Sequence, residues 1–96
     1  MQNHAGVNKL ITEIDETILL YYDYSFLIES ERCMVLIEKL IALIEKLLMQ
    51  LKREKQIQLQ TLLEQVLEAM AKKDDVLVRD LLYYDLRNFF QGDLCS

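Results

Sequence analysis

Between Gly6 and Gly92 this chain contains no glycine and no proline. Glycine supplies the positive-φ turns, and proline the fixed kinks, that separate the elements of most folds. A β-rich chain of 96 residues would need several tight turns, which favour Asn-Gly or Asp-Gly pairs. The sequence therefore predicts an all-α protein. It also lacks the glycine-rich loops that bind phosphates in many enzymes.

The strongest pattern in the chain predicts its second helix. Leu36–Ala42 is followed at once by Leu43–Met49, an almost identical seven-residue repeat. Apolar residues flank the heptad seam on both sides, so this helix should be covered on most sides, either in a bundle or at a subunit interface. The polar strip is Glu38, Lys39, Glu45 and Lys46, and the seam is Cys33, Ile37, Leu40, Ile44, Leu47 and Leu51.

Three other helices follow from apolar periodicity. The first should run from Val7 into the Tyr21–Tyr24 region, where apolar residues recur at alternating spacings of three and four. The third should place Leu59, Leu62, Leu63, Val66 and Met70 on its apolar face, and the fourth should bury Leu77, Leu81, Leu82, Leu86 and Phe89. Gly92 is expected to end the fourth helix.

Polar segments predict the connections between these helices. They are Asp23–Ser30, where Ser25 or Ser30 can cap the second helix, Lys52–Gln56, and Lys72–Asp75, where Asp74 is an N-cap candidate. We expect one domain, residues 1–96, that folds as an antiparallel up-down four-helix bundle. Residues 1–6 should be frayed and residues 92–96 a tail. Three longer helices are the alternative, because no strong breaker separates the second helix from the third.

The pentapeptide Leu-Leu-Tyr-Tyr-Asp occurs twice, at Leu19–Asp23 and at Leu81–Asp85. Tyrosine has an apolar body and a hydroxyl tip and is enriched at interfaces, so the two copies could form a polar groove between the first and fourth helices. The other interpretation, which we favour, is that both are edge-of-core tyrosines that are alike by chance in a leucine-rich chain.

The segment Ala69–Leu86 resembles the closing segment of small uncharacterised all-helical proteins of Gram-positive bacteria. That segment reads Ala-x4-Asp-x2-Leu-x2-Asp-x-Leu-x-Tyr-x-Leu, and the positions that match it are Ala69, Asp74, Leu77, Asp80, Leu82, Tyr84 and Leu86. The chain departs from it at Asp75, where an aromatic residue is usual, and at Asp85, where glutamate is usual. The resemblance implies an all-α bacterial protein and supplies no catalytic residue.

Charge and cysteine use limit the partners that we expect. The net charge is −5 with a pI near 4.8, and an acidic surface repels phosphate backbones, so we expect no nucleic-acid partner. The N-terminus lacks the features of a signal peptide, and no apolar run reaches the roughly 18 residues of a membrane span. Cys33 and Cys95 form no metal or redox spacing and suit a reducing compartment. We expect a cytoplasmic protein.

The sequence does not favour an enzyme. Metal–carboxylate bundles need glutamates and Glu-x-x-His pairs that point inward, whereas the one histidine is His4, near the expected frayed end. Cys33 lacks a histidine base within a predictable helix geometry. Asp23 or Asp85 would have to be buried to act as an acid or base. We therefore expect no catalytic residue, no bound metal and no cofactor.

The remaining hypothesis is a non-catalytic interaction or scaffold protein, most simply a homo-oligomer such as a dimer that self-associates through apolar helix faces. The hypothesis is based on apolar residues that remain after each helix has been given one buried apolar face. They are Leu20, Phe26, Leu27, Met34, Phe90 and Leu94. The predicted partner-binding residues are Tyr22, Phe26, Tyr83, Tyr84, Phe89 and Phe90. The alternative is a cytosolic flagellar or secretion export chaperone that binds an amphipathic helix of its client.

Overall fold

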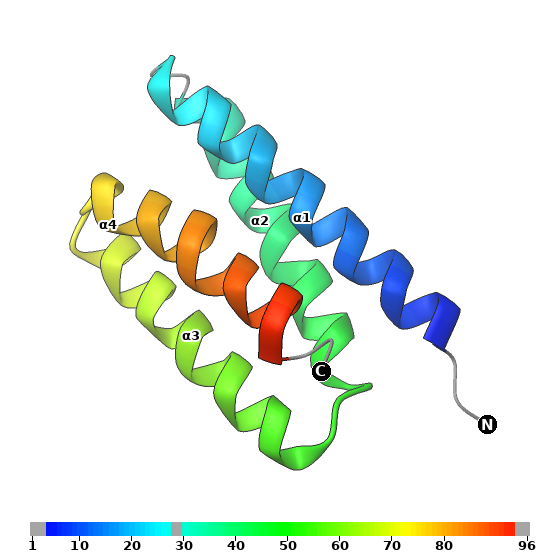
Figure 1. Ribbon diagram of the computed structural model, residues 1–96. Coiled ribbons are helices and arrows are strands. Elements are labelled where there is room, and N and C mark those ends of the chain that lie inside the picture. The colour runs from blue at the N-terminus through cyan, green and yellow to red at the C-terminus, as the bar shows by residue number, and fades with distance from the viewer. Residues whose placement is uncertain (1–3, 28–29, 94–96) are drawn as a thin grey trace. The chain divides into compact units, whose positions relative to one another are not determined.

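The computed structural model describes residues 4–27 and 30–93, and all of the regular structure in them is helical (Figure 1). The all-α prediction is therefore confirmed for these residues. The chain divides into two compact units, Met1–Gln50 and Leu51–Ser96. Each unit is a hairpin of helices. The single domain and the up-down four-helix bundle stay predictions.

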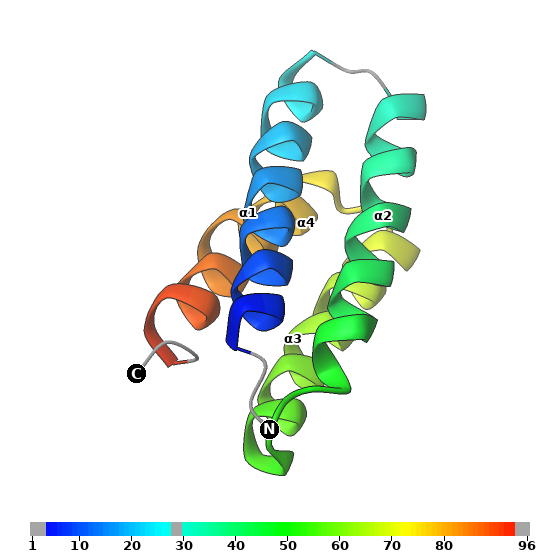
Figure 2. The same cartoon turned by 90° about the vertical axis from the view of Figure 1, so that its right-hand side faces the viewer.

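The first unit consists of α1 (His4–Phe26) and α2 (Ser30–Leu48), which lie side by side and run in opposite directions (Figure 2). Its buried residues are Ile14, Thr17, Ile18 and Tyr21 from α1 and Ile37, Leu40, Leu43, Ile44 and Leu47 from α2. Four of the six predicted seam positions are among them, and the other two, Cys33 and Leu51, are half-buried. The heptad pattern thus predicted the covered face of α2.

One buried residue of α1 is polar. The side chain of Thr17 is 1% exposed, and its hydroxyl donates a hydrogen bond of 2.7 Å to the backbone oxygen of Glu13. This bond satisfies the hydroxyl within its own helix, so Thr17 is buried without leaving an unpaired donor.

The boundary between α1 and α2 was left open by the sequence. The helix α1 continues past Asp23 to Phe26, and the hydroxyl of Ser25 donates to the backbone oxygen of Tyr22 at 2.7 Å. Ser25 therefore lies inside α1 and does not cap the next helix. The helix α2 begins at Ser30, the other cap candidate.

The second unit begins with α3 (Arg53–Ala71), and the predicted turn at Lys52–Gln56 is wrong in its position. The chain turns over residues 49–52, and the backbone N–H of Gln56 already donates to the oxygen of Lys52 at 2.8 Å. Arginine, glutamate, lysine and glutamine are good helix formers, so this polar run forms the first turn of α3. Within the described residues, α2 and α3 are separate helices.

A Schellman motif ends α3. The backbone N–H of Asp74 donates to the oxygen of Ala69 at 2.9 Å, and that of Lys73 donates to the oxygen of Met70 at 3.0 Å. Lys73 has a φ of 57°, the left-handed conformation that this motif requires and that glycine usually supplies. The chain therefore turns here on a lysine.

Asp74 then caps the following helix, as predicted. Its side-chain oxygen Oδ1 accepts a hydrogen bond of 3.1 Å from the backbone N–H of Leu77. That N–H is one of the donors that a helix start leaves without a partner. One short polar segment, Lys72–Asp74, thus closes α3 and opens α4.

The last helical segment consists of α4 (Asp75–Asp80) and two π-helical stretches, η1 (Leu81–Leu86) and η2 (Phe89–Asp93). Its buried residues are Val78, Leu81, Leu82, Leu86, Phe89 and Phe90, which confirms four of the five predicted positions. Leu77 is 43% exposed, so its predicted burial is wrong, because the buried stripe passes through Val78 instead.

The predicted stop at Gly92 is also wrong. Gly92 lies inside η2, which runs to Asp93, and its φ is not positive. A glycine ends a helix when it adopts the left-handed conformation, and Gly92 does not adopt it.

The two copies of the pentapeptide have different structures. Leu19–Asp23 is α-helical within α1, whereas Leu81–Asp85 lies in the π-helical η1. Their burial is also reversed: Leu20 is 46% exposed, while its counterpart Leu82 is 1% exposed. Identical local sequence therefore gives two environments, which agrees with chance similarity.

Candidate functional site

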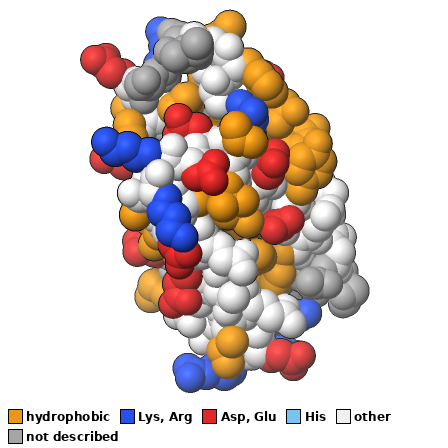
Figure 3. All heavy atoms as spheres, turned by 90° about the vertical axis from the view of Figure 1, so that its left-hand side faces the viewer, with side chains coloured by type: hydrophobic (Ala, Val, Ile, Leu, Met, Phe, Trp, Pro, Cys, Tyr) orange, Lys and Arg blue, Asp and Glu red, His pale blue; other side chains and the backbone are white. Residues whose placement is uncertain are grey.

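Several large apolar side chains of the first unit are open to solvent near the turn between α1 and α2. They are Leu20 (46% exposed), Phe26 (57%), Leu27 (64%), Met34 (55%) and Val35 (63%). On the face drawn in Figure 3, hydrophobic side chains likewise reach the surface between acidic and basic ones. Single exposed apolar residues are common in soluble proteins, whereas several at one end of a hairpin form a candidate contact surface.

A groove of about 420 Å³ lies between the last turns of α1 and the first turns of α2, and Leu20 and Val35 are among its lining residues. Its described lining residues are Leu20, Tyr24, Glu31, Arg32, Val35 and Leu36. On α1 the lining residues Leu20 and Tyr24 are four residues apart, so they lie one turn apart. On α2 two pairs have the same spacing, Glu31 with Val35 and Arg32 with Leu36. The volume lies within the range of small ligand sites.

Arg32 and Tyr24 join the two walls of this groove. The guanidinium Nη1 donates a hydrogen bond of 3.3 Å to the hydroxyl of Tyr24, and Cζ of Arg32 lies 5.3 Å from the centre of the tyrosine ring. This distance is within the range of a cation–π interaction. The pair therefore holds a positive charge beside the apolar lining residues Leu20 and Leu36.

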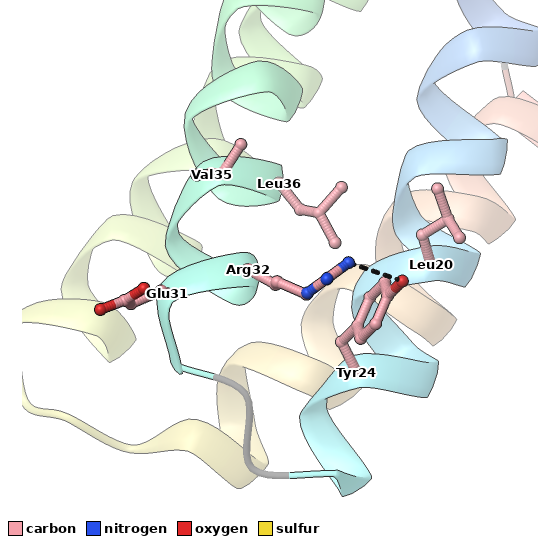
Figure 4. Close-up of a pocket in the computed structure, with 6 residues that line it drawn as sticks. All are labelled: Leu20, Tyr24, Glu31, Arg32, Val35 and Leu36. Carbon is pink, nitrogen blue, oxygen red and sulfur yellow. Dashed lines mark hydrogen bonds between the residues drawn. The ribbon is translucent and has the colours of Figure 1, made fainter.

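The close-up in Figure 4 shows how the lining side chains are directed. Leu20, Tyr24, Arg32 and Leu36 converge between the two helices, whereas the carboxylate of Glu31 points away from them. Among the described lining residues, Arg32 therefore supplies the charge inside the groove. An occupant that combines an apolar side chain with a carboxylate would be complementary to it.

The structure brings the first pair of predicted partner-binding residues together. The rings of Tyr22 and Phe26 lie edge to face, with centres 4.9 Å apart, on the last turns of α1. Tyr22 is half-buried and Phe26 is exposed. Phe26 is therefore the more accessible of the two for a partner.

The predicted residues of the second unit fall into two groups. Tyr83 is half-buried and Tyr84 is 54% exposed, with their ring centres 5.0 Å apart, and Cζ of Arg87 lies 4.9 Å from the ring centre of Tyr83. Phe89 and Phe90 are 3% and 1% exposed, so in this conformation they pack in the interior and are closed to a partner. Phe90, which was expected to be exposed apolar surface, thus belongs to the core. Leu94, the other such residue near the C-terminus, lies outside the described residues.

The sequence did not single out the groove. Tyr24, Arg32, Val35 and Leu36 were not predicted to bind a partner, although Leu20 was recognised as excess apolar surface. A signal was present, because the four-residue spacings Leu20–Tyr24 and Arg32–Leu36 flank the α1–α2 connection. Such spacing becomes informative once the ends of both helices are known.

The described part of the chain offers few groups for metal binding or catalysis. Among residues 4–27 and 30–93, no group of three or more His, Cys, Asp or Glu residues could hold a metal ion. Asp23 and Asp85, the candidate acids or bases, are both exposed. Cys33 is half-buried on α2, and Cys95 lies outside the described residues. No helix in these residues is long and apolar enough to cross a membrane.

Neither the protein-family models, nor the curated proteins, nor the solved structures contain a match to this chain. The resemblance of Ala69–Leu86 to Gram-positive proteins therefore stays a prediction.

Proposed function

We propose that this chain is a non-catalytic interaction protein of the bacterial cytoplasm that self-associates, as a dimer, through exposed apolar helix surface. The observation that carries the proposal is the group of apolar side chains at one end of the first unit, each between 46% and 64% exposed. Exposed apolar area is stabilised by about 25 cal/mol per Å² when a partner covers it. A second copy of the chain is the partner that is always present.

We also propose that each chain folds as an antiparallel up-down four-helix bundle. Short connections such as residues 49–52 and Lys72–Asp74 favour antiparallel neighbours. A hairpin of roughly 50 residues is also too small to form a stable core by itself in most proteins. One cooperative unfolding transition of the full chain supports the bundle, whereas two separate transitions would contradict it.

The self-association is tested with two matched variants, Val35→Gln and Val76→Gln. Both valines are exposed, at 63% and 58%, but Val35 lies on α2 and lines the groove, whereas Val76 lies on α4. We expect Val35→Gln to lower the average molar mass in light scattering at high concentration, and Val76→Gln to leave it unchanged. Equal masses for the wild type and Val35→Gln would contradict the proposal.

A second candidate function is a cytosolic flagellar or secretion export chaperone. The groove between α1 and α2 favours it, because a chaperone of this kind holds an amphipathic helix of its client in an apolar groove. Purification from the native host should then recover a secreted or flagellar helical protein in stoichiometric amount. Recovery of the chain alone, as a dimer, would support self-association instead.

A further inference from the structure

The outer face of α2 carries charged side chains in a regular pattern. Glu38, Lys39, Glu45 and Lys46 are all exposed, and none of them forms a salt bridge or side-chain hydrogen bond with a residue that the structure describes. Their spacing explains this, because opposite charges on a helix pair at separations of three or four residues. No acid–base pair among these four has that separation.

The four charges flank a line of apolar residues. Val35 and Ala42 are exposed and seven residues apart, and Met49, 84% exposed, continues the series just after α2. Each residue of an α-helix turns by about 100°, so the positions three and four residues after a given one lie on opposite sides of it. Val35 and Ala42 are each followed by glutamate at the third position and by lysine at the fourth.

The face therefore has an acidic flank, Glu38 and Glu45, and a basic flank, Lys39 and Lys46, on either side of its apolar line. Two copies of this helix can pack face to face in two symmetric ways. If the two-fold axis runs parallel to the helices, the helices are parallel and the acidic flank of one copy faces the basic flank of the other. An axis perpendicular to the helices, which makes them antiparallel, places like flanks against each other. The first arrangement brings glutamate to lysine, and the second brings glutamate to glutamate.

We propose that this face of α2 is the dimer interface, with the α2 helices of two copies parallel and related by a two-fold axis. Glu38 of one copy then lies opposite Lys39 of the other, and Glu45 lies opposite Lys46, with every pair formed twice. Val35 meets Val35 on the axis, and the small Ala42 lets the two helices approach closely. The inference rests on the proposed self-association and places it on the outer face of α2, which shares Val35 with the exposed apolar group at the end of the first unit.

The same pattern predicts a weak and salt-sensitive dimer. One face of one helix gives an interface at the small end of the range, below about 1,200 Å². Exposed ion pairs stabilise little, and salt screens them. The charges therefore act mainly on the choice of partner and on the relative direction of the helices.

Charge variants of the full chain test the interface. In Lys39→Glu/Lys46→Glu both flanks are acidic, and in Glu38→Lys/Glu45→Lys both are basic. We expect each to dissociate about tenfold more readily than the wild type in sedimentation equilibrium at low salt, and an equimolar mixture of the two to form a heterodimer. The control, Glu54→Lys/Glu64→Lys, makes the same change at two exposed glutamates of α3 and should associate like the wild type.

Cysteine cross-linking tests the direction of the helices. Met49→Cys is made with Cys33→Ser and Cys95→Ser and oxidised with copper phenanthroline. In the parallel arrangement the introduced thiols of the two copies adjoin and form a disulfide-linked dimer. In an antiparallel arrangement centred on Ala42 these thiols lie roughly 20 Å apart and do not form it. Cross-linking should disappear when Lys39→Glu/Lys46→Glu is added to the same chain.

The outcomes separate this inference from the proposed function. A wild type that stays monomeric overturns the proposed function and the interface with it. A wild type that associates, but whose affinity the two charge variants leave unchanged, overturns the α2 interface and leaves self-association intact. Association that the charge variants weaken, without cross-linking of the Met49→Cys chain, overturns the parallel arrangement.

Discussion

Arg32 at the start of α2 donates a hydrogen bond to the hydroxyl of Tyr24 near the end of α1, with a distance of 3.3 Å between Nη1 and the hydroxyl oxygen. The pair closes one end of the first hairpin and lies at the wall of its groove. The guanidinium of Arg32 also lies over the ring of Tyr24, so the contact combines a long hydrogen bond with a cation–π interaction.

Substitutions can separate these two contributions. Tyr24→Phe removes the hydroxyl and keeps the ring, so we expect the free energy of unfolding to fall by less than about 0.5 kcal/mol, since the bond is long and exposed. Arg32→Ala also removes the cation–π interaction and should cost about 0.5–1 kcal/mol. Urea denaturation measures both. Equal losses in the two variants would show that the hydrogen bond dominates, because Arg32→Ala removes that bond too.

Lys73→Gly is expected to stabilise the protein. Lys73 has a left-handed φ of 57° at the end of α3, where a side chain costs about 1 kcal/mol relative to glycine. Part of this gain is lost because glycine is more flexible in the unfolded chain. We therefore expect the free energy of unfolding to rise by roughly 0.5 kcal/mol. Lys73→Ala is the control, since it keeps the strained Cβ and should give no gain.

The repeated pentapeptide offers a matched pair of core substitutions. Leu82→Ala removes a side chain that is 1% exposed and should lower the free energy of unfolding by about 2–5 kcal/mol. Leu20→Ala makes the same change within the same five residues, but Leu20 is 46% exposed, so we expect a loss of less than about 1 kcal/mol. Similar losses in thermal or urea denaturation would contradict the different burial of the two copies.

The helices and much of the core could be predicted because the apolar pattern has the period of a helix. The heptad seam identified Ile37, Leu40, Ile44 and Leu47 as buried, and Asp74 was recognised as a cap from its place before an apolar run. These predictions depend on contacts that are local in sequence or on one helix face, which is the information that spacing contains.

The groove could not be predicted because it joins residues of two helices whose ends the sequence left open. Whether Tyr24 and Arg32 face each other depends on α1 reaching Phe26 and on α2 starting at Ser30. Gly92 shows a second limit of prediction from sequence. A glycine ends a helix only when its backbone adopts the left-handed conformation, which Gly92 does not, and the residue type alone does not reveal this. The pentapeptide shows a third, since the same five residues are α-helical in one place and π-helical in another.

Sedimentation equilibrium of the unmodified full chain, from dilute to concentrated solution at low salt, tests the central proposal of self-association most directly. We predict that the average mass rises with concentration from the 11.4 kDa of the single chain toward twice that value, and that added salt reduces the rise. A mass that remains 11.4 kDa at every concentration would contradict self-association.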